Sequence, residues 1–239
     1  MLRNLPGVQP TIVLAVAIIL ANNLATLWAG GDPARAHTLD LAKVGLWAAV
    51  VAWSLGAARL SLEDLGFRGG RALRSVGWGL GAGVGLAIPA LVFFTFPLVL
   101  PGPVQYAGYR DIDLGGLAAL LVPRFLLSTA LLEETLFRGL LQFQAVRALG
   151  AVRGIALSCA FFIVWHVAAD YQALNNTDLT GSALPFIALY VATAVPVGGA
   201  GLVFSLIRHA TGNLAGSIVA HMLVNSIILF FFAFGAIRG

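Results

Sequence analysis

Charged residues are scarce in this chain. Only 10% of its 239 residues are Asp, Glu, Lys or Arg, whereas 59% are hydrophobic. A soluble globular domain has about 25% charged residues, so the composition excludes a soluble fold and predicts an integral membrane protein. The small net charge of +4 gives no indication of nucleic-acid binding, and the lipid bilayer is the expected surrounding.

Cysteine is almost absent. The single cysteine, Cys159, excludes a disulfide within the chain and lies in an apolar run, which is typical of a small packing residue. There is also no Gly-x-Ser-x-Gly pattern, the usual sign of a serine hydrolase. The sequence therefore gives no support for a cysteine or serine nucleophile.

Long apolar runs dominate what is present. At about 20 residues per crossing, we expect an all-α, polytopic transmembrane helix bundle of about seven membrane helices, within limits of six to eight. It would form a single transmembrane domain over residues 1–239. The expected spans are residues 11–30, 41–58, 75–100, 114–149, 154–169, 184–207 and 214–234.

Proline and glycine mark details of these spans. The stretch 114–149 is long for one span, so we expect Pro123 to break it. Glycines spaced by four at 77, 81 and 85, and again at 79 and 83, predict close packing of helix against helix. No strand surrounds them, so a dinucleotide-binding loop is not indicated.

Basic residues are unevenly shared between the two ends of the expected spans. One side receives Arg35, Arg110 and Arg238, plus Lys43 near a helix end, where its ammonium can reach the interface. The other side receives Arg3, Arg59, Arg68, Arg71, Arg74, Arg147, Arg153 and Arg208. Because basic loops stay in the cytoplasm, we predict a cytoplasmic amino terminus.

Three charged residues nevertheless fall inside an apolar span: Glu133, Glu134 and Arg138. A charge at the bilayer centre costs about 2.5–3.5 kcal/mol on insertion scales. Residues four apart share a helix face, so Glu134 and Arg138 are expected to pair. Glu133 points elsewhere and has no partner on its own helix.

Two histidines are expected at the depth of Glu133. Glu133 lies fourteen residues from Arg147, His166 thirteen from Arg153, and His221 thirteen from Arg208. At 1.5 Å per residue, all three lie about 20 Å from the same boundary. Asn225 follows His221 by one helical turn, on the same face. His37 and His209 fall in loops, where we expect solvated side chains.

These residues suit the activation of water. Glu133 would act as general base, and His166, His221 and Asn225 would stabilise an oxyanion. Alternatively, Glu133, His166 and His221 match a catalytic zinc shell, although the local His-Glu-x-x-His spacing is absent. A proton-coupled transporter could also use such groups, but no internal repeat is present; a non-catalytic scaffold is a third possibility.

The same residues carry a resemblance to a known family. The patterns Glu133-Glu134-x-x-x-Arg138, Phe162-x-x-x-His166 and His221-x-x-x-Asn225 resemble the three motifs of the CPBP family. That family comprises type II CAAX prenyl endopeptidases and bacteriocin-processing or self-immunity proteins. The match extends from Arg124 to Asn225, and Leu65-Gly66-Phe67-Arg68 resembles the segment that usually precedes it.

The resemblance implies an intramembrane endopeptidase with a catalytic core at about residues 115–230. Glu133 would be the catalytic base, His166, His221 and Asn225 its partners, and Glu134 and Arg138 supporting residues. Members are described both as metalloproteases and as metal-independent glutamate proteases, so a divalent metal such as zinc stays open. The expected substrate is a membrane-associated or lipid-anchored peptide or protein. The Ala- and Gly-rich composition indicates a bacterial cell membrane, and an immunity protein without catalysis is the alternative within the family. The sequence does not indicate an oligomeric state.

Overall fold

Helices account for nearly all of the structure. The computed structural model describes residues 8–67, 71–97, 100, 102–106, 113–182 and 184–235. Within those ranges, β-structure is limited to an isolated bridge between Tyr106 and Thr177. The α-helices are α1 (Val8–Ala29), α2 (Pro33–Gly56), α3 (Leu62–Leu65), α4 (Ala72–Thr95), α5 (Leu114–Leu120), α6 (Leu132–Glu134), α7 (Gln142–Leu149), α8 (Ala151–Trp165), α9 (Val167–Asn175), α10 (Phe186–Thr211) and α11 (Ala215–Phe230). Three π-helical stretches, η4 (Leu121–Leu131), η5 (Thr135–Leu141) and η7 (Phe231–Gly235), and the 3₁₀ helix η6 (Asp178–Gly181) complete them.

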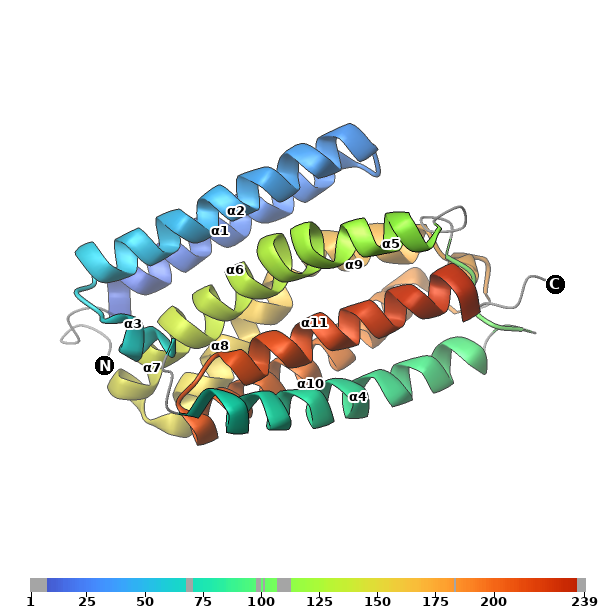
Figure 1. Ribbon diagram of the computed structural model, residues 1–239. Helices are drawn as coiled ribbons and strands as arrows, with labels where there is room; N and C mark the ends of the chain where they lie inside the picture. Colours follow the sequence, from blue (N-terminus) through green and yellow to red (C-terminus); the bar gives the residue numbers. More distant parts are fainter. Residues whose placement is uncertain are drawn as a thin grey trace.

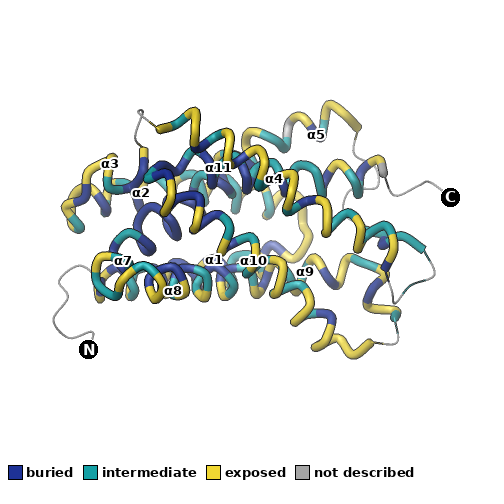
Figure 2. The backbone as a smooth tube through the Cα atoms, turned by 90° about the horizontal axis from the view of Figure 1, so that it is seen from below, coloured by how far each residue is buried: buried dark blue, intermediate teal, exposed yellow. Residues whose placement is uncertain are grey.

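The long helices form a bundle with roughly aligned axes. The α1–α2 hairpin lies on one flank and α4 on the opposite one (Figure 1). Six helices of the described chain are long and apolar enough to cross a membrane, or seven if α8 and α9 together make one span. Buried residues follow the inner faces of the helices (Figure 2). The prediction of an all-helical, polytopic membrane protein is confirmed.

Two expected interruptions in the chain are helical instead. The segment between the expected spans 11–30 and 41–58 is helical from Pro33 onward, because Asp32 caps α2 with hydrogen bonds from the amides of Ala34 and Arg35, and Pro33 occupies its first turn. Pro123 does not break the stretch 114–149, which runs as one helical rod. Pro123 falls in π-helical η4.

The polar segment after His166 also differs from expectation. The expected span ends at residue 169, but α9 continues to Asn175 and is followed by η6. The α9 axis is bent by 43° from that of α8. A short polar helix therefore extends the α8 span beyond a break at His166.

One of the two glycine series packs as predicted. Gly79 and Gly83 are buried in α4, where a Cβ on Gly79 would overlap the carbonyl of Gly216 and one on Gly83 would lie 3.0 Å from Leu223. By contrast, a Cβ on Gly77, Gly81 or Gly85 would meet nothing within 4 Å. Gly79 and Gly83 thus bring α4 against α11, which carries His221.

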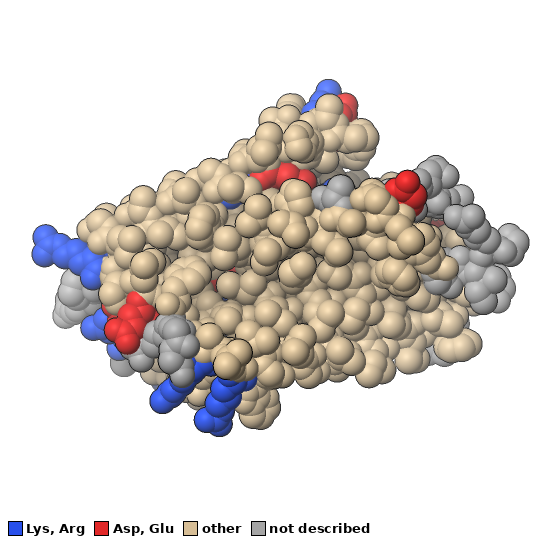
Figure 3. Space-filling view, in the orientation of Figure 1, with Lys and Arg blue, Asp and Glu red and all other residues tan. Residues whose placement is uncertain are grey.

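Basic side chains gather at one end of the bundle, near α3 and α7 (Figure 3). The α2–α3 connection, the start of α4 and the turns α7–α8 and α10–α11 meet there; they contribute Arg59, Arg71, Arg74, Arg147, Arg153 and Arg208. Arg3, Arg68, Arg110 and Arg238 lie outside the described residues. The membrane orientation remains a prediction.

Candidate active site

The acidic motif lies in a helix of irregular winding. Three α-helical residues, Leu132–Glu134, are flanked by π-helical η4 and η5. Single π turns are frequent at functional sites because they redirect side chains. Glu133 is 2% exposed, and Glu134 and Arg138 are fully buried.

Glu134 and Arg138 form the expected pair. Arg138 donates from Nη1 to Glu134 Oε1 at 2.9 Å and from Nη2 to the Gly201 carbonyl at 3.0 Å. Its guanidinium also lies 4.1 Å from the ring centre of Phe162 and 5.3 Å from that of Phe204. These contacts fix the helix Leu114–Leu149, which carries the acidic motif and is called the acidic helix below, to α8 and α10.

Glu134 has a second partner. Its Oε1 accepts a hydrogen bond from Nδ1 of His221 at 2.8 Å. The His221 ring stacks on Phe204, with ring centres 5.1 Å apart and planes 22° apart. One buried carboxylate therefore orients both Arg138 and His221.

Glu133 faces the two histidines. Its Oε2 lies 3.7 Å from Nε2 of His166 and 3.8 Å from Nε2 of His221. This buried oxygen has no hydrogen-bond partner among the described residues. The structure thus brings together, from three separate helices, the carboxylate and both imidazoles that the sequence placed at one depth.

The proton positions of the two imidazoles follow from their other contacts. Nδ1 of His166 lies 2.8 Å from the Phe162 carbonyl, which can only accept, so Nδ1 carries a proton. Nδ1 of His221 likewise donates to the carboxylate that pairs with Arg138. In a neutral imidazole the lone pair is then on Nε2, and both Nε2 atoms face Glu133. A neutral imidazole in this position accepts a hydrogen bond from water, whereas an imidazolium donates one from Nε2.

Asn225 stands apart from this group. It is half-buried in α11, one turn after His221. Its side chain makes no hydrogen bond to any other described residue. The amide is therefore available to a bound molecule, and the structure does not join it to Glu133.

The donor types at Glu133, His166 and His221 suit zinc, but their arrangement does not. In the described part of the chain, no group of three or more His, Cys, Asp or Glu side chains is placed to hold a metal ion. The chemistry below is therefore derived from the side chains alone.

Sequence reasoning missed the contribution of α2. Trp47 donates to Thr135 Oγ1 at 3.2 Å, and Ser128 donates to Asp40 at 3.0 Å. In both pairs the residue of the acidic helix comes 88 positions after its partner in α2, so the two helices run side by side in the same direction. That offset puts Lys43 level with Leu131. Its ammonium does not reach toward the interface as expected, but lies 5.7 Å from the ring centre of Trp165.

Lys43 therefore places an amine beside the site. The charged groups close enough to act on it are Glu133, Asp40 and Arg124, and Nε of Arg124 lies 3.9 Å from Asp40. A lysine near the start of the expected span 41–58 was the available signal. The registry of α2 against the acidic helix was not readable from the sequence.

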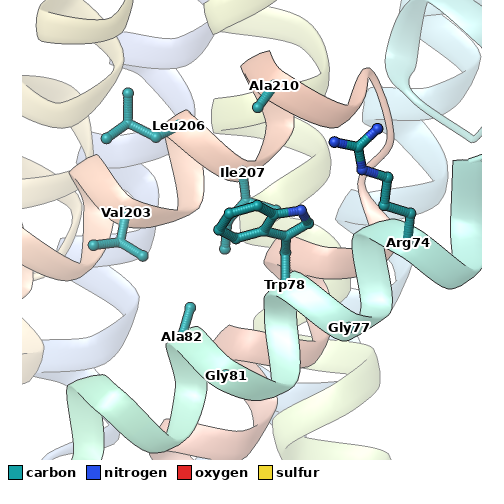
Figure 4. Close-up of a pocket in the computed structure, with 9 residues that line it drawn as sticks. All are labelled: Arg74, Gly77, Trp78, Gly81, Ala82, Val203, Leu206, Ile207 and Ala210. Carbon is teal, nitrogen blue, oxygen red and sulfur yellow. The ribbon is translucent and has the colours of Figure 1, made fainter.

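A groove of about 740 Å³ lies elsewhere, between α4 and α10. Figure 4 shows Arg74 toward one end of it and Val203 toward the other, with the Trp78 indole between them beside Ile207. Its lining is otherwise small or aliphatic and includes none of the candidate site residues. It is a feature of the bundle surface and not part of the candidate active site.

Comparison with known proteins agrees with the motif analysis. Searches of curated proteins and of solved structures find no match to this chain. Residues 115–227 match the family model described as type II CAAX prenyl endopeptidase Rce1-like. This segment, less than half of the chain, contains Glu133, His166, His221 and Asn225, and over it the chain is similar to type II CAAX prenyl endopeptidases.

Proposed function

We propose that the protein hydrolyses peptide bonds of a membrane-associated or lipid-anchored polypeptide by a glutamate-type mechanism. The observation that carries this proposal is the unpaired Oε2 of Glu133, held 3.7 and 3.8 Å from two imidazole nitrogens. A buried carboxylate facing a space bounded by hydrogen-bonding groups can position and deprotonate one water.

The reaction begins with water bound between Glu133 and His166. The water donates one hydrogen to Glu133 Oε2 and the other to Nε2 of His166, whose orientation is fixed by its bond to Phe162. As the water oxygen forms a bond with the substrate carbonyl carbon, Glu133 takes its proton. The C–N bond then breaks, and Glu133 returns the proton to the leaving amine.

The negative charge on the carbonyl oxygen requires hydrogen-bond donors. We assign this role to Asn225, whose amide is available, and to His221 carrying a proton on both nitrogens. The charge of that imidazolium is balanced by Glu134, 2.8 Å away, and by Glu133. Arg138 keeps Glu134 in place and does not touch the substrate.

The test is cleavage of a membrane-anchored reporter-peptide library by the purified protein in liposomes. We expect Glu133→Gln to lower the cleavage rate by roughly 10²–10⁴-fold, the usual contribution of a general base. Asn225→Ala is expected to lower it by roughly 10²–10³-fold, as for the loss of an oxyanion donor. Asp113→Asn, which alters an exposed cap but keeps a good capping residue, is the matched control and is expected to retain full activity.

The same assay separates this proposal from its alternatives. Cleavage that persists in Glu133→Gln would reject the assignment of the base. A folded wild-type protein that cleaves no member of the library would favour a scaffold or immunity role. Activity that is lost on chelation and restored by zinc would replace the glutamate-type mechanism by a metal-dependent one.

A further inference from the structure

His166 is the residue at which one helix ends and the next begins. α8 ends at Trp165, α9 begins at Val167, and their axes differ by 43°. His166 has φ −86° and ψ −5°, away from regular helical values. The placement of its imidazole therefore depends on what keeps this break in the helix.

Asn23 of α1 occupies the break. Its Nδ2 donates to the Val164 carbonyl at 3.0 Å, and its Oδ1 accepts from the Ala168 amide at 2.8 Å. In an uninterrupted helix, residues 164 and 168 would bond to each other. The Asn23 amide thus stands in place of one hydrogen bond of the helix, a recognised cause of sharp kinks.

Both the amide nitrogen and the amide oxygen of Asn23 make hydrogen bonds. Its second amide hydrogen goes to the Ile19 carbonyl of its own helix at 3.0 Å. Two neighbours support it: Asn22 donates to the Trp165 carbonyl at 3.3 Å, and Gln172 donates to the Thr26 carbonyl at 2.6 Å. Because lipid offers no hydrogen bonds, a break within the membrane needs such partners.

We propose that Asn23 is a positioning residue that keeps the helix broken at His166 and so holds its Nε2 beside Glu133. The proposal rests on the proposed function, in which His166 orients the attacking water. Without Asn23, the Val164 carbonyl and Ala168 amide have each other as nearest partners, and residues 151–175 can close into one helix. His166, whose Nδ1 is bound to Phe162 on α8, would then change direction. α1 lies outside the family-matched residues 115–227, so the site would depend on a helix that the family match does not include.

Two variants test the role of Asn23 in the full-length protein. Asn23→Ala lets the 164–168 bond form, and Asn23→Asp keeps the shape but sets a carboxylate oxygen against the Val164 carbonyl. Leu24→Ala, at a 69% exposed position on the same helix, is the control. We expect both Asn23 variants to lower kcat at least tenfold with KM within twofold of wild type, and Leu24→Ala to change neither.

A second measurement does not depend on activity. Spin labels at residues 20 and 175, in a Cys159→Ser background, report the separation of α1 from the far end of α9. Straightening a 43° bend displaces the end of a nine-residue helix by about 9 Å, so Asn23→Ala is expected to shift or broaden the distance distribution by several ångströms.

The two measurements together decide the proposal. A shifted distance with unchanged kcat, or a lowered kcat with an unchanged distance, would overturn it. Absence of cleavage by the wild-type protein would count against the proposed function instead, and an unaltered distance in Asn23→Ala would then still refute the structural role of Asn23.

Discussion

At the scale of single residues, the buried pair of Glu134 and Arg138 has the largest consequence for stability. Both side chains are fully buried, and their atoms lie 2.9 Å apart. Removing one partner of a buried ion pair leaves an uncompensated charge, which costs about 3–5 kcal/mol. We therefore expect Glu134→Gln to lower the unfolding free energy by about that amount, measured by denaturant titration in mixed micelles.

The double variant Glu134→Gln/Arg138→Met provides the control for this prediction. It removes both charges and retains much of the volume, so it is expected to be more stable than Glu134→Gln alone. A double variant as unstable as the sum of its single substitutions would show that the two charges are not coupled. Cleavage should be lost in both Glu134→Gln and the double variant, because His221 loses its carboxylate partner in each.

The sequence predicts residue contacts well within one helix and poorly between helices. Spacing by four is sufficient to pair Glu134 with Arg138, and equal depth brings Glu133, His166 and His221 to one level. The depth of a residue in the membrane does not, however, determine how its helix is rotated about its axis, and so which neighbouring helix its side chain faces. The positions of Asn23 against Val164 and of Lys43 against Trp165 depend on that rotation, and the sequence alone did not predict them.

At the scale of helices, the contact of α4 with α11 makes the two glycine series unequal. A Cβ on Gly79 would overlap the backbone of Gly216, and neither backbone can yield without separating the helices. We expect Gly79→Ala to destabilise the protein by about 1–3 kcal/mol, the usual effect of overpacking. Because α11 carries His221, the cleavage rate should fall as well.

Gly81→Ala is the matched control, one half-turn further along the same helix. Nothing lies within 4 Å of the added carbon, and alanine favours a helix over glycine by about 0.5–1 kcal/mol. The melting temperature in detergent should therefore fall for Gly79→Ala and rise slightly for Gly81→Ala. Equal shifts for the two variants would contradict the packing described here.

For whole helices, the sequence predicts that a helix packs closely but not which of its faces does so, nor where the helix begins. The small-residue pattern correctly indicated close packing of α4, but both series fit it, and only the position of α11 distinguishes Gly79 from Gly81. Similarly, Asp32 and Pro33 contain the signal for a helix start, yet the polar composition of residues 31–40 concealed it. Local composition therefore located the spans better than it located their ends.

At the scale of the whole molecule, the distribution of charge predicts how the bundle lies in the membrane. Basic side chains of several connections meet at the end formed by α3, α7 and the start of α4 (Figure 3). The opposite end has Arg35 at the α1–α2 turn, where it lies 3.8 Å from Asp32 and is partly neutralised. Because connections rich in Arg and Lys are retained in the cytoplasm, we expect the α7–α8 turn inside and the α1–α2 turn outside.

Single cysteines in a Cys159→Ser background test this orientation. Val152, 83% exposed at the start of α8, and Ala34, exposed at the start of α2, mark the two ends of the bundle. A membrane-impermeant maleimide applied to intact cells should label Ala34→Cys at once and Val152→Cys only after permeabilisation. The reverse pattern would show that the charge bias does not set the topology.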